Sequence, residues 1–481
     1  MHHHQPNNPN SNSFVFPRED NRKKNSIKTL SEISYTNRKQ HRIDIQRQSY
    51  KNKKNELLNQ LKRKKETDHG TSNGLELDLS VGNIGVYLEQ LSSLSNNLSQ
   101  KLSAIKQCRM ILSKCSSETL NDILNEYPQL VHVFHHHLTS KYSELQLESA
   151  WCITNIAAVR DDCVAFCIST LVQIISNSFI DIVLQEQCIW ALGNIALGVH
   201  EGNILLSTVI VQNGAIPYLA NIIRACRVNE VVKTTLWCAS NIIKNELLHL
   251  HTQSEPQQLI WNSLGNLYEP IIYLLLKRQA TDVEIIYELL FVLTYLTAIP
   301  VQFSDESHSK NFLSQMAQIC VKYLKLQNCA FNVPIVRLLG NLFSQVNLFS
   351  LLDQTFAFEL MNLLISLKDK NKEWCYMMSN ISSFEEINEI LVQNYSLIEV
   401  MNHIIAQDAS SNDKELLREA TITLINLVTA NQNKHLTIPI AQLIAKQIAP
   451  NFIDDDSELN QQFKSILEQF CGYVSALFPC L

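Results

Sequence analysis

The sequence predicts an all-α fold made of stacked helical repeats, and three observations lead to this prediction. Glycine and proline are scarce, at 11 and 12 of 481 residues, which argues against an all-β chain with many tight turns. Apolar residues follow a helical pattern from about residue 80 almost to the end. Similar segments then recur at intervals typical of helical repeat proteins. A repeat array also suits this length better than one compact core.

The repeat is marked by an aromatic residue followed four positions later by asparagine. Three copies are clear, namely "WCITN" (151–155), "WALGN" (190–194) and "WCASN" (237–241). Weaker copies begin at residues 291, 337, 376 and 422, and we call each copy a rung and the whole series the ladder. Successive steps are 39, 47, 54, 46, 39 and 46 residues, the spacing of armadillo or HEAT repeats. The longest step predicts an insertion around residues 251–258.

On a helix, Glu148, Trp151 and Asn155 form one stripe, apart from the apolar residues that pack. An asparagine amide on an open face can donate to and accept from the backbone of an extended peptide. An indole beside it can cover the stem of a lysine or arginine, with some cation–π attraction. One such tryptophan is more often a core residue, as we expect of Trp261 and Trp374, but copies in register favour a groove for a basic peptide.

Charge is distributed unevenly along the chain. Residues 18–65 hold 16 of the 40 basic residues and only 5 of the 46 acidic ones, so the remainder is acidic. A basic arm joined to an acidic body can bind that body or outside partners. The predicted organisation is a disordered N-terminus at 1–17, a basic flexible arm at 18–66, a linker at 67–79 and a superhelical solenoid of about eight to nine repeats at 80–481.

Other chemistry is poorly supported by the sequence. The 13 cysteines lie mostly in apolar helical segments and predict free thiols in a reducing compartment. Neither a secretory signal nor an apolar run of about 18 residues occurs. His132 and His135–His137 point around a helix, and Cys163 and Cys167 lack a second ligand pair, so we predict no metal site. Catalytic motifs are missing too, which predicts neither an enzyme nor a cofactor.

From about residue 20 to 430, the sequence resembles the importin-alpha (karyopherin-alpha) family of nuclear import adaptors. "LESAWCITNIA", "EQCIWALGNIALG" and "RLLGN" resemble its armadillo repeats. "RKQHRIDIQRQSYKNKKNELLNQLKRKK" resembles its importin-beta-binding segment. The resemblance implies that nuclear localisation signals of cargo bind the groove, and that the arm binds importin-beta or occupies the groove itself. It also implies shuttling between cytoplasm and nucleus, with an export receptor and nuclear pore proteins as further partners; neither a membrane nor nucleic acid is expected.

The resemblance assigns residues to three sites. The implied major cargo site contains Glu148, Trp151, Asn155, Gln187, Trp190, Asn194, Trp237 and Asn241. The implied minor cargo site contains Glu288, Arg337, Tyr376, Asn380, Glu419 and Asn426. The implied residues for importin-beta binding and self-inhibition are Arg38, Lys39, Arg42, Arg47, Lys51, Lys53, Lys54, Lys62, Arg63, Lys64 and Lys65. Lys244 matches in charge an arginine that the family carries between the two cargo sites.

The sequence departs from the family pattern at several places. Gly198 stands where the family has an aspartate that pairs with a cargo lysine, and Glu201 is a candidate substitute. The minor site has Tyr376 and Ile422 in place of tryptophans, which predicts weaker lysine slots. The C-terminal repeat looks shortened, with "FIDDDSELN" (452–460) as a candidate acidic tail, and this puts recycling by the export receptor in question.

Two other classes of function remain as alternatives. A cytosolic armadillo scaffold for signalling or adhesion partners ranks lower, because such scaffolds usually present a basic groove whereas this body is acidic. Nucleic-acid binding through residues 18–65 would show a steep dependence on salt. A linear basic arm without an aromatic platform favours a protein partner instead.

Overall fold

The structure is a computed structural model that describes residues 81–93, 97–200, 204–249, 257–277, 282–299, 306–395, 397–408, 413–431 and 464–470, with residues 95, 442 and 472. The predicted N-terminus, basic arm and linker lie outside these residues, as do Glu201 and the acidic segment 452–460. The predicted insertion at 251–258 lies almost wholly outside them.

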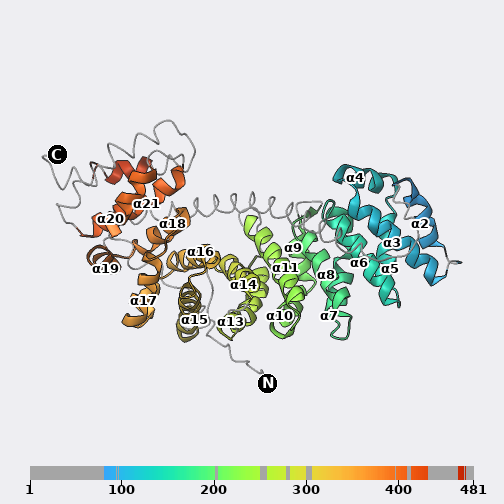
Figure 1. Cartoon of the computed structure of the whole chain (residues 1–481), viewed down its shortest axis with the longest axis horizontal. Helices are drawn as coiled ribbons and strands as arrows, with labels where there is room; N and C mark the ends of the chain where they lie inside the picture. The colour runs from blue at the N-terminus through green and yellow to red at the C-terminus, as the bar shows by residue number, and fades with distance from the viewer. Residues whose placement is uncertain are drawn as a thin grey trace, which may run out of the picture. The chain divides into compact units, whose positions relative to one another are not determined.

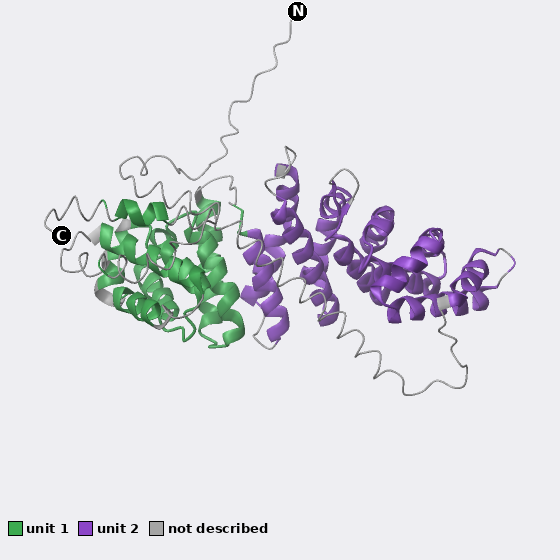
Figure 2. Cartoon of the chain, turned by 90° about the horizontal axis from the view of Figure 1, so that it is seen from above, with its two compact units in different colours: residues 1–42, 297–481 green, residues 43–296 purple. Residues whose placement is uncertain are grey.

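The described residues are almost all helical, which confirms the all-α prediction. The chain divides into two compact units, residues 43–296 and residues 1–42 with 297–481 (Figure 2). The first three rungs and the one at residue 291 belong to the first unit, and the later rungs belong to the second.

The unit of residues 43–296 contains thirteen described α-helices. They are α2 (Ile84–Ser92), α3 (Leu98–Lys114), α4 (Ser117–Glu126), α5 (Leu130–Leu138), α6 (Ser143–Ala157), α7 (Ile168–Ser176), α8 (Ile182–Ile195), α9 (Leu206–Gln212), α10 (Ala215–Ala225), α11 (Asn229–Leu248), α12 (Gln257–Leu264), α13 (Tyr268–Lys277) and α14 (Val283–Leu296). Short 3₁₀ helices are η1 (Val81–Asn83), η2 (Asp162–Cys167) and η4 (Gly265–Leu267), and strands β1 (Val199–His200) and β2 (Ile204–Leu205) form an antiparallel hairpin.

The helices that carry the rungs form a layer of their own in this unit. Helices α3, α6, α8, α11 and α14 pack one against the next in chain order, as Figure 1 shows. Helix α7 packs against α10, and α10 against α13, in a second layer. Cys152, Cys188 and Cys238 on these ladder helices are fully buried as free thiols. The expectation that cysteines act as small core residues is therefore confirmed at these positions.

Local sequence sets where the helices of this unit begin. Asn97 caps α3 through a capping box with Gln100, in which each side chain bonds the other residue's backbone N–H. Asp181 accepts from the first amides of α8, which otherwise would have no partner. Gly214, with φ of 79°, supplies the left-handed turn between α9 and α10. These signals fix the ends of the helices that position the ladder.

The second unit contains α-helices and short 3₁₀ helices, and its residues 464–470 are helical as well. Its named helices are α15 (Glu306–Leu324), η5 (Cys329–Phe331), α16 (Asn332–Phe343), η6 (Leu348–Leu351), α17 (Gln354–Ile365), α18 (Lys372–Ile381), α19 (Glu385–Tyr395), α20 (Leu397–Asp408) and α21 (Lys414–Asn431). The rung-bearing helices α16, α18 and α21 again pack in chain order. Trp374 is fully buried and donates its indole N–H to the Leu364 carbonyl, which confirms the core prediction for it.

No single helix within the described ranges is long and apolar enough to cross a membrane. One bent pair, α9 with α10, meets the criterion by length and composition only.

Candidate functional site

Three tryptophans on neighbouring helices form the centre of the candidate site. Trp151 lies on α6, Trp190 on α8 and Trp237 on α11, and each side chain is half-buried. Because α6 packs on α8 and α8 on α11, the indoles follow one another along one face of the helix layer. The ladder helices thus place successive rings at the spacing of adjacent helices, about 8–10 Å.

The asparagines join each rung to the one before it. Asn194 donates its side-chain N–H to the Thr154 carbonyl at 3.1 Å, and Asn241 donates to the Gly193 carbonyl at 3.0 Å. In both cases the acceptor is the residue just before the preceding rung's asparagine. The amide nitrogen is therefore used to hold neighbouring helices together and is not available to a ligand.

The asparagines of the second and third rungs are less open than the sequence predicts. Asn241 is fully buried and Asn194 is 7% exposed, whereas Asn155 on the first rung is half-buried. The physical reason is the close stacking of ladder helices, which lets an asparagine reach the backbone of the next helix. The sequence shows the period of these residues but not the partner of each amide.

We expect Asn241→Ala to lower the free energy of unfolding more than Asn155→Ala does. Asn241 loses a buried hydrogen bond and leaves the Gly193 carbonyl unpaired, at a cost of about 1–3 kcal/mol. The Nδ2 atom of Asn155 has no hydrogen-bond partner among the described residues, so its removal should cost less. Urea denaturation of both variants followed by circular dichroism tests this order, and equal losses would contradict the structural role of the Asn241 amide.

Two aromatic rings of the ladder pack against a glycine of the preceding helix. A Cβ on Gly193 would lie 2.3 Å from Cζ3 of Trp237, so the indole rests directly on the glycine backbone. In the second unit, a Cβ on Gly340 would lie 3.2 Å from Cδ1 of Tyr376. Glycine is otherwise unfavourable inside a helix. In the sequence, this close approach is indicated by the glycine that precedes asparagine in "WALGN" and "RLLGN".

The first rung already has a cation beside it. Cζ of Arg109, on α3, lies 4.8 Å from the centroid of the Trp151 ring. Its Nε donates to Oε2 of Glu148 at 2.6 Å. Glu148 is therefore paired within the protein, an arrangement that spacing within one helix could not reveal.

Gln187 also serves the contact between α6 and α8. Its side-chain N–H donates to the Thr154 hydroxyl at 2.7 Å, and the residue is only 6% exposed. Thr154 in turn donates to the Ala150 carbonyl within its own helix at 2.8 Å. Gln187 thus belongs to the predicted stripe, but its side chain forms a hydrogen bond across the contact between α6 and α8.

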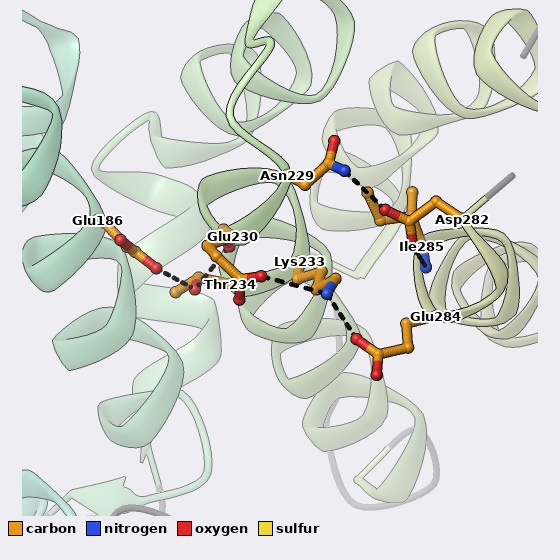
Figure 3. Close-up of polar contacts among 8 residues, drawn as sticks. All are labelled: Glu186, Asn229, Glu230, Lys233, Thr234, Asp282, Glu284 and Ile285. Carbon is orange, nitrogen blue, oxygen red and sulfur yellow. Dashed lines mark hydrogen bonds and ion pairs between the residues drawn. The ribbon is translucent and has the colours of Figure 1, made fainter. Parts of the chain in front are cut away.

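Acidic side chains lie near the N-terminal ends of α8, α11 and α14 (Figure 3). Thr234 donates its hydroxyl to Glu186 at 2.9 Å, which orients this carboxylate between α8 and α11. Lys233 pairs with both Glu230 and Glu284. No lysine or arginine in the described ranges pairs with Glu186. Glu186 is not among the residues predicted from the sequence, although it precedes Trp190 by one helical turn and so shares its face.

A carboxylate also lies over Gly198. A Cβ on this glycine would lie 2.5 Å from Cγ of Asp161, which comes from the loop after α6. Position 198 follows Asn194 by four residues, at the C-terminal end of the same stripe. Asp161 thus brings an acidic group to the place where a side chain on residue 198 would project. Sequence spacing could not show this, because the two residues belong to different repeats.

The hairpin after Gly198 is fastened by a buried carboxylate on α11. Ser207 and Thr208 donate their hydroxyls to Oε1 of Glu246 at 2.6 and 2.7 Å. Asn245 donates to the Ser207 hydroxyl at 3.1 Å and lies within 3.4 Å of the Gly198 carbonyl. Burial raises the pKa of Glu246 above its ordinary value of 4.5, and the two hydroxyl bonds partly oppose this effect.

This raised pKa predicts a pH dependence of stability. The folded state favours protonated Glu246 more than the unfolded chain does, so its contribution is complete below pH 4.5 and is lost as the pH rises through the raised folded value. We expect Glu246→Gln to remove this loss, so that the variant gains stability relative to the wild type as the pH increases. Thermal melts from pH 4 to pH 8 measure this, and parallel curves would contradict it.

Lys244 lies near the C-terminal end of α11 and contacts the rung on α14. Its Nζ is 4.7 Å from the ring centroid of Tyr295, which is the last position of the rung on α14. Phe291 and Tyr295 are both almost fully buried, with ring centroids 5.9 Å apart. Glu288, one turn before Phe291, is half-buried. This rung is therefore more closed than those of the three tryptophans.

The later rungs repeat the asparagine contacts in the second unit. Asn380 donates to the Gly340 carbonyl at 2.8 Å, and Asn426 donates to the Ser379 carbonyl at 3.1 Å. Both acceptors again precede the previous rung's asparagine. Tyr376 is 4% exposed, so the ring that replaces a tryptophan is enclosed.

Charged residues of the predicted minor site are paired internally. Nη2 of Arg337 lies 2.8 Å from Oε1 of Glu373, with side-chain exposures of 17% and 9%. Glu419 accepts from the Ser379 hydroxyl at 3.0 Å and lies 3.7 Å from Nε of Arg418. These contacts leave less accessible charge here than beside Trp190.

The histidines of α5 have separate partners. His132 stacks on Phe166 with ring centroids 4.6 Å apart, while His135 contacts the Thr170 hydroxyl and His137 the Leu91 carbonyl. Across the described ranges, no group of three or more His, Cys, Asp or Glu side chains is placed to hold a metal ion.

The fold and ladder define an all-α armadillo-repeat protein. An engineered protein solved by the Northeast Structural Genomics Consortium aligns over 81% of this chain and 98% of its own, with a TM-score of 0.52 and 20% identity. This likeness concerns the fold alone. A search for protein-family models gave no match.

The curated relatives of the chain are importin alpha subunits, which confirms the resemblance found in the sequence. Importin subunit alpha-9 of Arabidopsis thaliana is 28% identical over 249 residues, which cover 51% of this chain and 44% of the relative. Importin subunit alpha-2 of the same plant is 27% identical over 158 residues, or 32% of this chain and 28% of the relative. Importin subunit alpha-1b of Oryza sativa subsp. japonica is 24% identical over 159 residues, with the same two coverages. The chain therefore spans less than half the length of each relative.

Proposed function

We propose that this protein is a divergent nuclear import adaptor that binds basic nuclear localisation signals along the ladder. The observation that carries the proposal is the row of half-buried Trp151, Trp190 and Trp237 on consecutive helices. Flat rings at this spacing can hold the aliphatic stems of successive lysine or arginine side chains. The similarity to importin alpha subunits supports the same function.

The acidic groups around these rings support a cationic ligand. Glu186, held by Thr234, offers a carboxylate between α8 and α11. Asp161 brings a second carboxylate over Gly198, where the resemblance implies an aspartate. We propose that the ammonium groups of the cargo are recognised at these two places, and that Asp161 takes the role for which Glu201 was the earlier candidate.

The peptide backbone would meet the asparagines in a restricted way. The amide nitrogens of Asn194 and Asn241 hold the preceding helices, and Asn241 is fully buried, so of these two residues the side-chain carbonyl of Asn194 is the group left for a peptide N–H. Asn155 is the most exposed of the three asparagines, although its Nδ2 is enclosed without a hydrogen-bond partner in the described part of the chain. The first rung should therefore offer the peptide backbone its most accessible asparagine.

The second unit would provide a weaker minor site. Its candidate residues are Arg337, Tyr376, Asn380, Glu419 and Asn426. Enclosed Tyr376 and internally paired Glu419 favour lower affinity than at the tryptophans. Cargo with a single basic cluster should accordingly prefer the rungs from Trp151 to Asn241.

The basic arm, residues 18–66, would connect cargo to importin-beta. Charge complementarity with the acidic body allows Lys62, Arg63, Lys64 and Lys65 to compete with cargo for the ladder when importin-beta is absent. A tethered competitor acts at high effective concentration, so its removal raises the affinity for cargo. Movement between cytoplasm and nucleus, an export receptor and nuclear pore proteins belong to the same proposal.

The test is a titration of a fluorescent lysine-rich signal peptide into two full-length proteins. One is the wild type, and in the other Lys62, Arg63, Lys64 and Lys65 are replaced by alanine. We expect the variant to bind about tenfold more tightly or better, because the tethered competitor is removed. Equal affinities would contradict self-inhibition. Binding to neither protein would contradict the adaptor function and favour a scaffold for other ligands.

A further inference from the structure

Arg109 occupies the position in α3 that an aromatic residue occupies in the next ladder helices. It precedes Trp151 by 42 residues, within the range of steps along the ladder. Helix α3 packs against α6 just as α6 packs against α8. Ser113 follows it at the asparagine position. The ladder therefore extends one helix further than its aromatic residues, and its first position holds an arginine.

The Arg109 guanidinium makes the two contacts that a bound cation would make. It lies 4.8 Å from the centroid of Trp151 and 2.6 Å from a Glu148 carboxylate oxygen. The side chains of Arg109 and Glu148 are only 22% and 14% exposed, so this pair is partly withdrawn from water. An arginine in such a place is a strong competitor, because it is always charged and its planar group suits both a ring and a carboxylate.

A similar pair of arginine and glutamate occurs at a rung of the second unit. Arg337 stands at an aromatic position, and its guanidinium lies 2.8 Å from Glu373. Glu373 precedes Tyr376 by three residues, as Glu148 precedes Trp151. In both units, therefore, an arginine in an aromatic position neutralises the glutamate of the following rung.

The next two rungs differ from this pattern. Gln187 and Thr234 stand three residues before Trp190 and Trp237, so neither rung has a glutamate there. Within the described ranges no lysine or arginine stacks on either indole. The rungs of Trp190 and Trp237 are thus the ones at which no described lysine or arginine stacks on the ring.

We propose that Arg109 is a built-in end stop of the ladder. It fills the cation slot on the α3 side of Trp151, so a bound basic segment places its terminal long cationic side chain on the α8 side, between Trp151 and Trp190. Arg109 thereby sets the register and the number of cationic residues that the site reads. This inference rests on the proposed binding of basic peptides.

The test compares Arg109→Gln with the wild type, both as full-length chains with Lys62, Arg63, Lys64 and Lys65 replaced by alanine. The probes are one short lysine-rich peptide and versions extended by a single lysine or alanine at either end. In the parent chain a lysine extension should add no more than an alanine extension does. In Arg109→Gln, lysine at one end should tighten binding about fivefold to tenfold, because Trp151 and Glu148 can now receive it.

A second variant separates this effect from a change in folding. Arg109→Gln with Glu148→Gln removes both charges, leaves no glutamate without its cation, and should lose the gain from the extra lysine. The same lysine gain in the parent and both variants would overturn the end stop while leaving the proposed function intact. Failure of every protein to bind the unextended peptide would instead overturn the proposed function, and the end stop with it.

Discussion

Gly193→Ala is expected to displace Trp237 and to weaken both the fold and peptide binding. The new methyl group would lie 2.3 Å from the indole and 3.2 Å from the Cα of Cys238, so ring and helix must move apart. Overpacking of this kind costs about 1–3 kcal/mol. The movement also lengthens the Asn241 bond to the Gly193 carbonyl. Urea denaturation, near-ultraviolet circular dichroism and peptide titration measure the three effects.

Gly265→Ala is the matched control for this substitution. A Cβ on Gly265 meets no atom within 4 Å, so the same chemical change creates no contact. We expect this variant to match or slightly exceed the wild type, because alanine restricts the unfolded chain more than glycine does. Should Gly193→Ala prove as stable as Gly265→Ala and bind peptide normally, the close approach of Trp237 to α8 would be refuted.

Replacing both Trp190 and Trp237 by alanine is expected to reduce the affinity for a lysine-rich peptide about 1000-fold. Each indole would be a hot spot worth about 2 kcal/mol, because it covers a cationic side chain that otherwise stays in water. The loss should be almost complete in practice, since the two rings border the slot that Glu186 faces. Fluorescence anisotropy at fixed salt measures it.

Trp261→Ala provides the control for the double replacement. Trp261 is also half-buried, but it lies on α12 and outside the ladder. Its loss should leave the peptide affinity unchanged even if stability falls. A double variant that still binds like the wild type would show that the ligand uses another surface.

The sequence predicted the helical fold and the ladder because both depend on period alone. Trp151, Trp190 and Trp237 recur at repeat spacing, and this is sufficient to place them on equivalent faces of successive helices. The buried positions of Cys152 and Trp374 followed in the same way from apolar surroundings. Periodicity therefore identifies which residues share a face, including those that line a candidate site.

Contacts between repeats could not be predicted from that period. Arg109 reaches Glu148 across 39 residues, and Thr234 reaches Glu186 across 48. The side-chain N–H of Asn241 donates to the backbone of α8, although the position of this residue in the repeat is equally consistent with an open face. Such details depend on how closely neighbouring helices stack, which a single helical pattern does not encode.

The most direct measurement of the central claim is a map of where a basic peptide binds. A lysine-rich peptide with a photoreactive group, crosslinked to the full-length chain with Lys62 to Lys65 neutralised, is digested and analysed by mass spectrometry. We expect crosslinks at the ladder faces of α6, α8 and α11, around Trp151, Trp190 and Trp237, and their loss with excess unlabelled peptide. Crosslinks that are confined to α7, α10 and α13 and are lost with excess unlabelled peptide would contradict the ladder as the peptide-binding surface.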